Sequence, residues 1–253
     1  MLDFISFELG LSDWLILGLC AFLVGVSKTG VPGFGILVVP LMASVLPAKT
    51  TVGLMLPMLI FADLFAAGYW RYHAQWKHLI RLIPWALSGI IIAYFIMERI
   101  ENEQLKTTIA IIVLTMLALR FRQNFLKRKG NETAVPTHWA FAAVMGLLAG
   151  ITTMMAHAAG PVMTIYLLSM RMPKKKFVGT TAWFFFVVNW LKVPFSAKLD
   201  LITVETLKLD LCLFPLIFLG AVAGVLALKR IPQKIFDILV LVLAAAAAIK
   251  LLF

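Results

Sequence analysis

The sequence predicts an all-α polytopic membrane protein. Of its 253 residues, 62% are hydrophobic and only 14% are charged, whereas soluble domains are about half apolar. Apolar runs recur to the last residue, and a helix that spans a bilayer needs about 20 such residues. A transmembrane β-barrel would require alternating segments of about ten residues. The sequence contains no such pattern.

Ten apolar segments are expected to be helical, and short polar links separate them. They cover residues 14–27, 34–47, 51–70, 79–97, 104–121, 138–154, 160–170, 177–195, 210–228 and 234–252. A polar, basic linker at residues 122–137 divides the chain. We therefore expect a first transmembrane repeat at residues 1–121 and a second at residues 138–253, joined by a cytoplasmic linker.

The two halves share the spacing of their glycine, proline and polar residues. The matching positions are Gly25, Ser27 and Gly35 with Gly150, Thr152 and Gly160 at an offset of 125, Pro47, Gly53 and Asp63 with Pro173, Gly179 and Asn189 at 126, and Pro84, Gly89 and Arg99 with Pro215, Gly220 and Arg230 at 131. The offset changes only in links, as a duplicated fold predicts. Because each half contains five segments, an odd number, we expect two inverted-topology repeats.

The basic residues indicate how the chain is oriented. Fifteen of them lie in four links, at residues 71–81, 120–130, 171–176 and 229–234, and the other links hold six. Cytoplasmic loops of membrane proteins are rich in Lys and Arg, so these four links are expected inside and both termini outside. The same rule accounts for the net charge of +11. We therefore predict the lipid bilayer, and no nucleic acid, as a partner.

The first two segments of each half are short, at about 11 to 17 residues by sequence. A helix rises 1.5 Å per residue, so most of these segments fall short of about 30 Å of hydrocarbon. We interpret them as half-helices that form a broken, re-entrant helical hairpin in each half, followed by three transmembrane helices. Full but tilted crossings are the alternative.

A polar motif at residues 27–35 interrupts the first of these hairpins. Irregular backbone is tolerated at membrane depth only where it is buried in protein or lines a cavity, and the N-terminus of a half-helix attracts anions. The candidate binding groups are Ser27, Lys28, Thr29, Gly30, Gly33 and Gly35. Alternatively, Lys28 lies in an ordinary loop or reaches an interface, and the glycines serve close helix packing.

The second hairpin offers different groups. Thr152, His157 and Gly160 lie at its turn, and the imidazole of His157 is able to donate to an anion or to titrate near neutrality. As a lone histidine, His157 is equally compatible with a packing role. A ligand between the hairpins would therefore contact different groups on its two sides. We place the anion on the Lys28 side.

Three polar residues interrupt later segments. Asp63 and Asn189 are matched by the repeat and lie mid-segment, and a buried acid in a span indicates function. Asp63 is a candidate coupling residue that carries a proton, or it pairs with Lys28 or Lys192. Lys192 lies one helical turn after Asn189, so both are substrate-binding candidates. Alternatively, Lys192 lies near the outer interface, because Pro194 marks the end of its segment.

These motifs, the two-repeat plan and the basic central linker resemble the TauE/SafE (TSUP) family of sulfite and organosulfonate exporters over nearly the whole chain. The positions that carry the resemblance are Gly30, Gly33, Gly35 and Pro40 in the first half and Gly160 and Pro161 in the second. The second motif lacks the glycine cluster, which leaves the substrate open. The resemblance implies transport of a small sulfur-containing or related anion across a bacterial plasma membrane, with sites in the paired motifs.

Catalysis is not expected. The four histidines show no metal-ligand spacing, and the sequence has neither a G-x-S-x-G elbow nor a Walker motif. We expect no cofactor and no metal. Without a nucleotide-binding motif there is no built-in ATP drive, so we expect a facilitator or an ion-coupled secondary carrier. The alternatives are a membrane scaffold or assembly factor, an importer, and a carrier of another anion or of a cation held by Asp63. Proton coupling and a homo-oligomer are left open.

Overall fold

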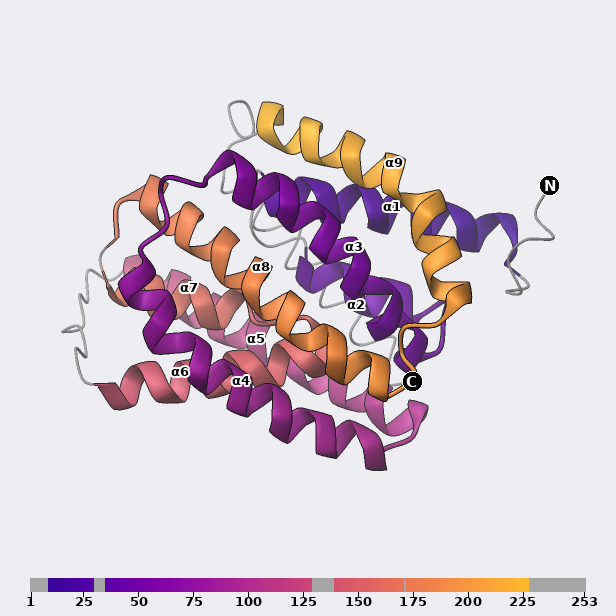
Figure 1. Ribbon diagram of the computed structural model, residues 1–253, viewed down its shortest axis with the longest axis horizontal. Helices are drawn as coiled ribbons and strands as arrows, with labels where there is room; N and C mark the ends of the chain where they lie inside the picture. The colour runs from indigo at the N-terminus through magenta and orange to yellow at the C-terminus, as the bar shows by residue number, and fades with distance from the viewer. Residues whose placement is uncertain (1–8, 30–34, 129–138, 171, 228–253) are drawn as a thin grey trace.

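The computed structural model describes residues 9–29, 35–128, 139–170 and 172–227, and within these ranges it contains nine helices and no strand. The helices are α1 (Leu11–Thr29), α2 (Gly35–Ala43), α3 (Ala48–Tyr69), α4 (Trp76–Arg99), α5 (Asn102–Arg128), α6 (Trp139–Ala156), α7 (Gly160–Ser169), α8 (Lys174–Lys198) and α9 (Val204–Ala227) (Figure 1). The all-α fold class is confirmed. The tenth expected segment, at residues 234–252, lies outside the described residues.

The helices correct two expected boundaries. α1 has 19 residues and α6 has 18, so each is about 27–28 Å long and is not a half-helix. The serine, threonine and lysine residues near the ends of α1 and α6 remain helical, because their side chains find hydrogen-bond or ion-pair partners within the protein. α2 and α7, with 9 and 10 residues, are as short as expected. In addition, α5 continues to Arg128, so the first seven residues of the expected linker are helical.

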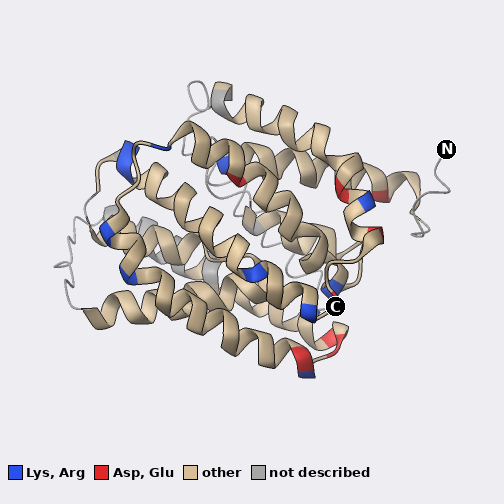
Figure 2. Ribbon diagram, in the orientation of Figure 1, with Lys and Arg blue, Asp and Glu red and all other residues tan. Residues whose placement is uncertain are grey.

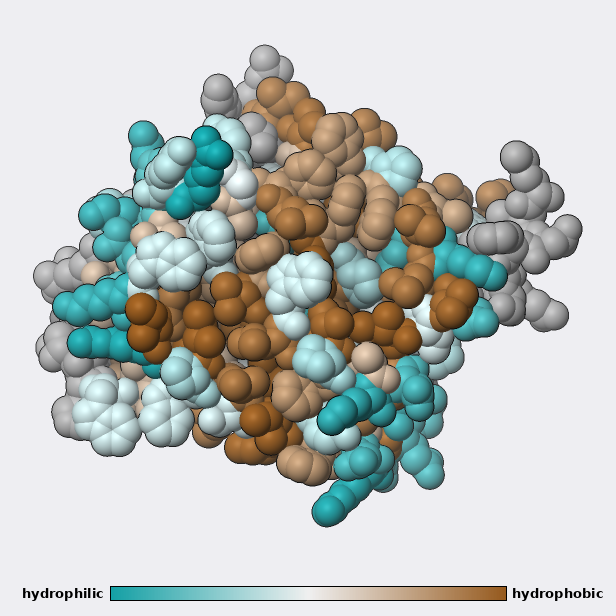
Figure 3. Space-filling model, viewed as in Figure 1, coloured by the Kyte–Doolittle hydropathy of each residue, from teal (hydrophilic) through white to brown (hydrophobic). Residues whose placement is uncertain are grey.

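Among the described residues, five helical segments are long and apolar enough to cross a membrane: α1, α3, α4, α6 and Val204–Gly224 of α9. Many of their large apolar side chains are exposed, including Leu15, Ile80 and Leu211. On the face that Figure 3 shows, apolar residues form a central band with hydrophilic residues at both ends. A band of this kind is what a bilayer requires of the surface in contact with its hydrocarbon.

The helix packing exchanges elements between the halves. The most extensive contacts among the described helices are those of α1 with α9 and of α4 with α6, and α3 and α8 lie between these two pairs (Figure 1). By the sequence offsets, α1 corresponds to α6 and α9 to α4. Each pair therefore joins the first helix of one half to the fourth helix of the other.

Repeat-related glycines make equivalent contacts in the two pairs. A Cβ at Gly25 would collide with the carbonyl oxygen of Ile217, and a Cβ at Gly150 would collide with that of Ala86. These four residues match at the offsets of 125 and 131. Small residues allow helix backbones to approach closely in a membrane, and here they bring two pairs of helices together in the same way.

The glycine contacts also give the helix directions. Gly18 on α1 faces Leu216 on α9, and Gly224 on α9 faces Val26 on α1. Residue numbers rise together along both helices, so α1 and α9 are parallel. The contacts between α4 and α6 rise together in the same way. Within each pair, the helix from the first half and the helix from the second half therefore begin at the same end of the protein.

Charges differ between the two ends of the molecule. At the end where α4, α6 and α8 begin, here called the basic end, the described charged residues are Arg71, Lys77, Arg81, Lys175 and Lys176. The opposite end, here called the acidic end, carries Asp13, Glu98, Glu101, Glu103, Asp200 and Glu205 together with Lys49, Arg99, Lys106, Lys198 and Lys208. Figure 2 shows basic residues without acidic ones at one end, and acidic residues together with further basic residues at the other.

We expect Gly25→Ala to destabilise the protein by about 1–3 kcal/mol or more, because its methyl group would collide with backbone atoms of α9 that cannot shift independently. Thermal unfolding in detergent, followed by the fraction of monodisperse protein, measures the loss. Gly68→Ala on α3 is the matched control, since a Cβ there meets nothing within 4 Å. Equal melting temperatures for the two variants would contradict close packing at Gly25.

Candidate functional site

A hydrogen bond between the two halves lies at the centre of the protein. Asn189 Nδ2 on α8 donates to Asp63 Oδ2 on α3 at 2.6 Å, and both residues are almost completely buried. The two positions match at the sequence offset of 126, and each comes from a different half of the chain. Each residue lies 15 positions after the start of its helix, at Ala48 for α3 and at Lys174 for α8. Because these helices begin at opposite ends, the contact lies about midway between the ends.

Lys28 completes this contact from a third helix. Its Nζ lies 2.7 Å from Asp63 Oδ1 and 4.3 Å from the ring centre of Phe185. Lys28 belongs to the last turn of α1, so the alternative of an ordinary loop is wrong. Of the two pairings considered for Asp63, the structure has the one with Lys28. The aromatic face adds a cation–π interaction to the ion pair.

Lys192 is fully buried, one turn after Asn189 on α8. Its Nζ donates to the carbonyl oxygen of Thr153 at 3.1 Å and to Thr153 Oγ1 at 3.2 Å. His157 Nδ1 lies 2.9 Å from the same Nζ. Three acceptors match the three N–H donors of an ammonium group. Lys192 is therefore a buried, fully partnered side chain, and its distance from the outer interface stays a prediction.

The hydrogen bonds of His157 define its tautomer. Nε2 lies 3.0 Å from the carbonyl oxygen of Val52, which accepts only, so Nε2 carries the proton. Nδ1 is then the acceptor for Lys192. His157 also has a left-handed backbone, with φ at 48°, an uncommon conformation for a residue other than glycine. This conformation ends α6 and aims the ring at Lys192.

The end of α6 stabilises the positive charge of Lys192. The carbonyl groups in the last turn of a helix carry the negative end of its dipole, and Thr153 lies in the last turn of α6. Gly160 and Pro161 begin α7 four residues later, with proline at a position where its missing N–H costs nothing. The negative end of the α6 dipole is thus followed, within this hairpin, by the positive end of the α7 dipole.

These side chains form one polar cluster, which we call the central cluster. Its members are Lys28, Asp63, Thr153, His157, Asn189 and Lys192. Lys28 and Asp63 both interact electrostatically with Lys192. Within the described residues, no carboxylate lies within 4 Å of Lys192. The cluster therefore contains two cationic side chains and one anionic side chain.

The remaining candidate residues have other roles in the structure. Ser27 Oγ accepts the amide N–H of Gly35 at 3.2 Å, so that this amide already has a partner. Thr29 Oγ1 donates to the carbonyl of Ala221 at 2.8 Å and thus joins α1 to α9. Thr152 Oγ1 donates to Leu148 in its own helix. A Cβ at Gly160 would meet nothing within 4 Å. Gly30 and Gly33 lie outside the described residues.

Sequence reasoning missed several groups of this site. Neither Thr153 nor Phe185 was a candidate by sequence, and no periodicity indicates that Val52 offers a carbonyl to His157. Asp210 was placed at a segment boundary. It lies within α9, fully buried, and neither of its carboxyl oxygens has a hydrogen-bond partner in the described part of the chain. An acid between apolar residues such as Leu209 and Leu211 was the available signal.

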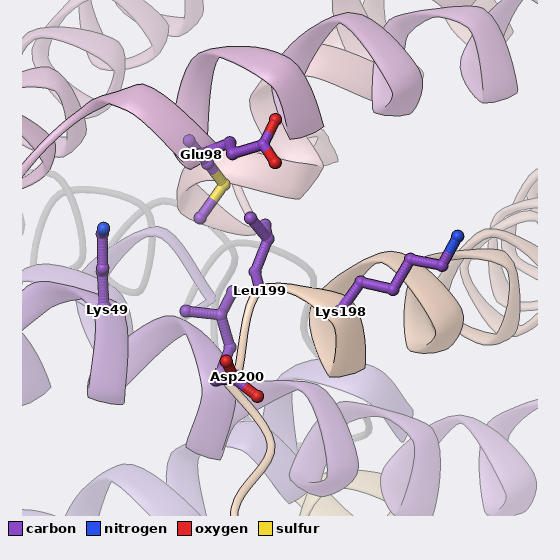
Figure 4. A pocket seen from close by; sticks show the side chains of 7 residues that line it. Lys49, Glu98, Lys198, Leu199 and Asp200 are labelled. Atoms are coloured by element: carbon purple, nitrogen blue, oxygen red, sulfur yellow. The ribbon is translucent and has the colours of Figure 1, made fainter.

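A pocket of about 200 Å³ opens at the acidic end, where α3 begins and where α4 and α8 end. Lys49, Glu98, Lys198 and Asp200 contribute its charged side chains (Figure 4). Two lysines and two acids give no net charge. The pocket therefore does not favour either sign of ligand, in contrast to the central cluster.

A family model described as sulfite exporter TauE/SafE matches residues 17–251. The chain belongs to the TauE/SafE sulfite exporter family. No curated protein and no solved structure matches the chain. TauE/SafE is a transporter family, in agreement with the apolar helices and with the absence of enzyme motifs from the sequence. In the described residues of this TauE/SafE protein, no group of three or more His, Cys, Asp or Glu residues is placed to hold a metal ion.

Asp210→Leu is expected to stabilise this TauE/SafE protein by about 1–3 kcal/mol, since the change removes buried polar atoms without partners. The repeat supplies the replacement, because the position equivalent to Asp210 is Leu79, which is fully buried on α4. Thermal unfolding in detergent measures the change. The reverse substitution, Leu79→Asp, is the control and should lower the melting temperature. A lower melting temperature for Asp210→Leu would show that the carboxyl group stabilises the fold.

Proposed function

We propose that this protein is a secondary transporter that exports a small sulfur-containing anion, such as sulfite or an organosulfonate, and binds it at the central cluster between the two halves. The observation that carries this proposal is the fully buried Lys192, which has only neutral partners among the described residues. A buried charge without a counter-charge is costly in a membrane. An anionic substrate supplies that counter-charge.

The surroundings of Lys192 support an anion site. The start of α7 presents the positive end of a helix, and open space lies on the side of Gly160 where a side chain would otherwise stand. Lys28 brings a second positive group from the other half of the chain. Groups from both halves therefore surround one region midway between the ends of the protein.

The arrangement also suggests how access alternates. Substrates of inverted-repeat transporters bind near the midplane, and one repeat moves against the other around the site. Here Asp63 and Asn189 form the contact between equivalent helices, so a movement of α3 against α8 passes through the central cluster. Without a nucleotide-binding motif, the drive comes from the substrate gradient or from a coupled ion.

We further propose that the basic end faces the cytoplasm of a bacterium and that the acidic end, with both termini, faces outward. The support is the sequence, in which the four links assigned to this end hold fifteen Lys and Arg residues and the other links hold six, as the positive-inside rule requires. The parallel directions of α1 with α9 and of α4 with α6 agree with this orientation.

Lys192→Gln should lower sulfite flux at least about tenfold, because the change removes charge-assisted interactions of about 1.5–3 kcal/mol with the anion. Glutamine retains a donor for Thr153 and His157. Uptake of labelled sulfite into proteoliposomes measures the flux. Lys198→Gln on the exposed end of the same helix is the control and should leave flux unchanged. A membrane scaffold, in contrast, would show no sulfite flux even with the wild-type chain.

The orientation is tested by single cysteines in a background without Cys20 and Cys212. A cysteine at Glu101, which is exposed at the acidic end, should react with a membrane-impermeant maleimide in intact cells. A cysteine at Lys175, which is exposed at the basic end, should react only after the cells are opened. Reaction of Lys175→Cys in intact cells would reverse the orientation.

A further inference from the structure

We propose that the central cluster selects its anion by charge, accepting monoanions over dianions, and that Asp63 is the residue that sets this selectivity. The inference rests on the proposed function and specifies the class of substrate at the same site: a sulfur oxyanion that carries a single negative charge, such as hydrogensulfite or an alkanesulfonate.

The first step is the charge of the cluster. Lys192 donates to three acceptors, as an ammonium group does, and Lys28 is paired with Asp63. His157 is neutral, because it accepts at Nδ1 while Nε2 donates to Val52. Two positive groups and one carboxylate leave a net charge of one. A single negative charge on the substrate completes the balance.

The second step is the asymmetry of the repeat. The equivalent positions 63 and 189 hold an aspartate and an asparagine, which have nearly the same shape and hydrogen-bond to each other. Two asparagines would leave a charge of plus two, and two aspartates would balance the lysines without substrate. The pair of one aspartate and one asparagine therefore determines the net positive charge that the ligand has to balance.

The third step is the cost of the wrong charge. A dianion would leave one negative charge in excess between buried groups, and an unbalanced charge in such a site costs several kcal/mol. Asp210 is not part of this count, because it lies on α9 and neither hydrogen-bonds nor pairs with a residue of the cluster in the described part of the chain. The end of α6 lowers the cost of the positive charge on Lys192.

Two probes of similar chemistry separate the charges. Methanesulfonate is a monoanion and sulfate is a dianion throughout the neutral range, and both have a sulfur centre bonded to oxygens. Their fluxes into proteoliposomes are compared for the wild-type chain, for Asp63→Asn, and for the double exchange of Asp63→Asn with Asn189→Asp. The double exchange keeps both side-chain types and the net charge of the cluster.

The wild-type chain is expected to carry methanesulfonate at least about tenfold faster than sulfate. In Asp63→Asn the ratio of the two fluxes should fall at least about tenfold, with an absolute gain in sulfate flux, and the double exchange should raise the ratio again. Equal wild-type fluxes of the two probes would overturn the inference even if Asp63→Asn fails to fold. An unchanged ratio in folded Asp63→Asn would overturn it as well. Absence of flux for both probes and for sulfite would instead contradict the proposed function.

Discussion

The hydrogen bond from Asn189 to Asp63 is the contact on which the polar interior depends. The core of a bilayer offers no water, so each buried polar group needs a partner within the protein. Asp63 accepts from Asn189 on one side and pairs with Lys28 on the other. These two interactions connect α1, α3 and α8. Lys192, one turn along α8, then reaches the end of α6, and His157 returns the network to α3.

This network explains why the two hairpins differ although the halves are related. Lys28 lies at the end of α1, and the repeat places Thr153 at the corresponding point of α6. Thr153 then binds a lysine that comes from α8. Each hairpin therefore contains or contacts one ammonium group. In the first half this group is Lys28, which belongs to the hairpin itself, and in the second half it is Lys192, which belongs to α8. The two halves thus place an ammonium group at matching points, while different residues supply it.

Much of the fold could be predicted from the sequence, because apolar runs and repeat offsets report helices directly. The offset of 126 paired Asp63 with Asn189 before any contact was known. The ends of α1 and α6 could not be predicted, since Lys28 and Thr153 resemble interruptions until their partners on other helices are seen. The partner of Asp63 had to be chosen between two lysines, and periodicity within a helix does not report contacts between helices. The left-handed conformation of His157 is likewise set by its contacts with Val52 and Lys192.

The packing of α1 against α9 has a consequence for how the chain is made. Thr29 and Ala221 are 192 residues apart in the sequence, and their hydrogen bond joins the first described helix to the last. During synthesis α1 is inserted long before α9 exists, so its glycine face must remain against lipid or temporary neighbours until then. The two halves cannot mature one after the other as independent units. The fold closes only when nearly the whole chain has entered the membrane.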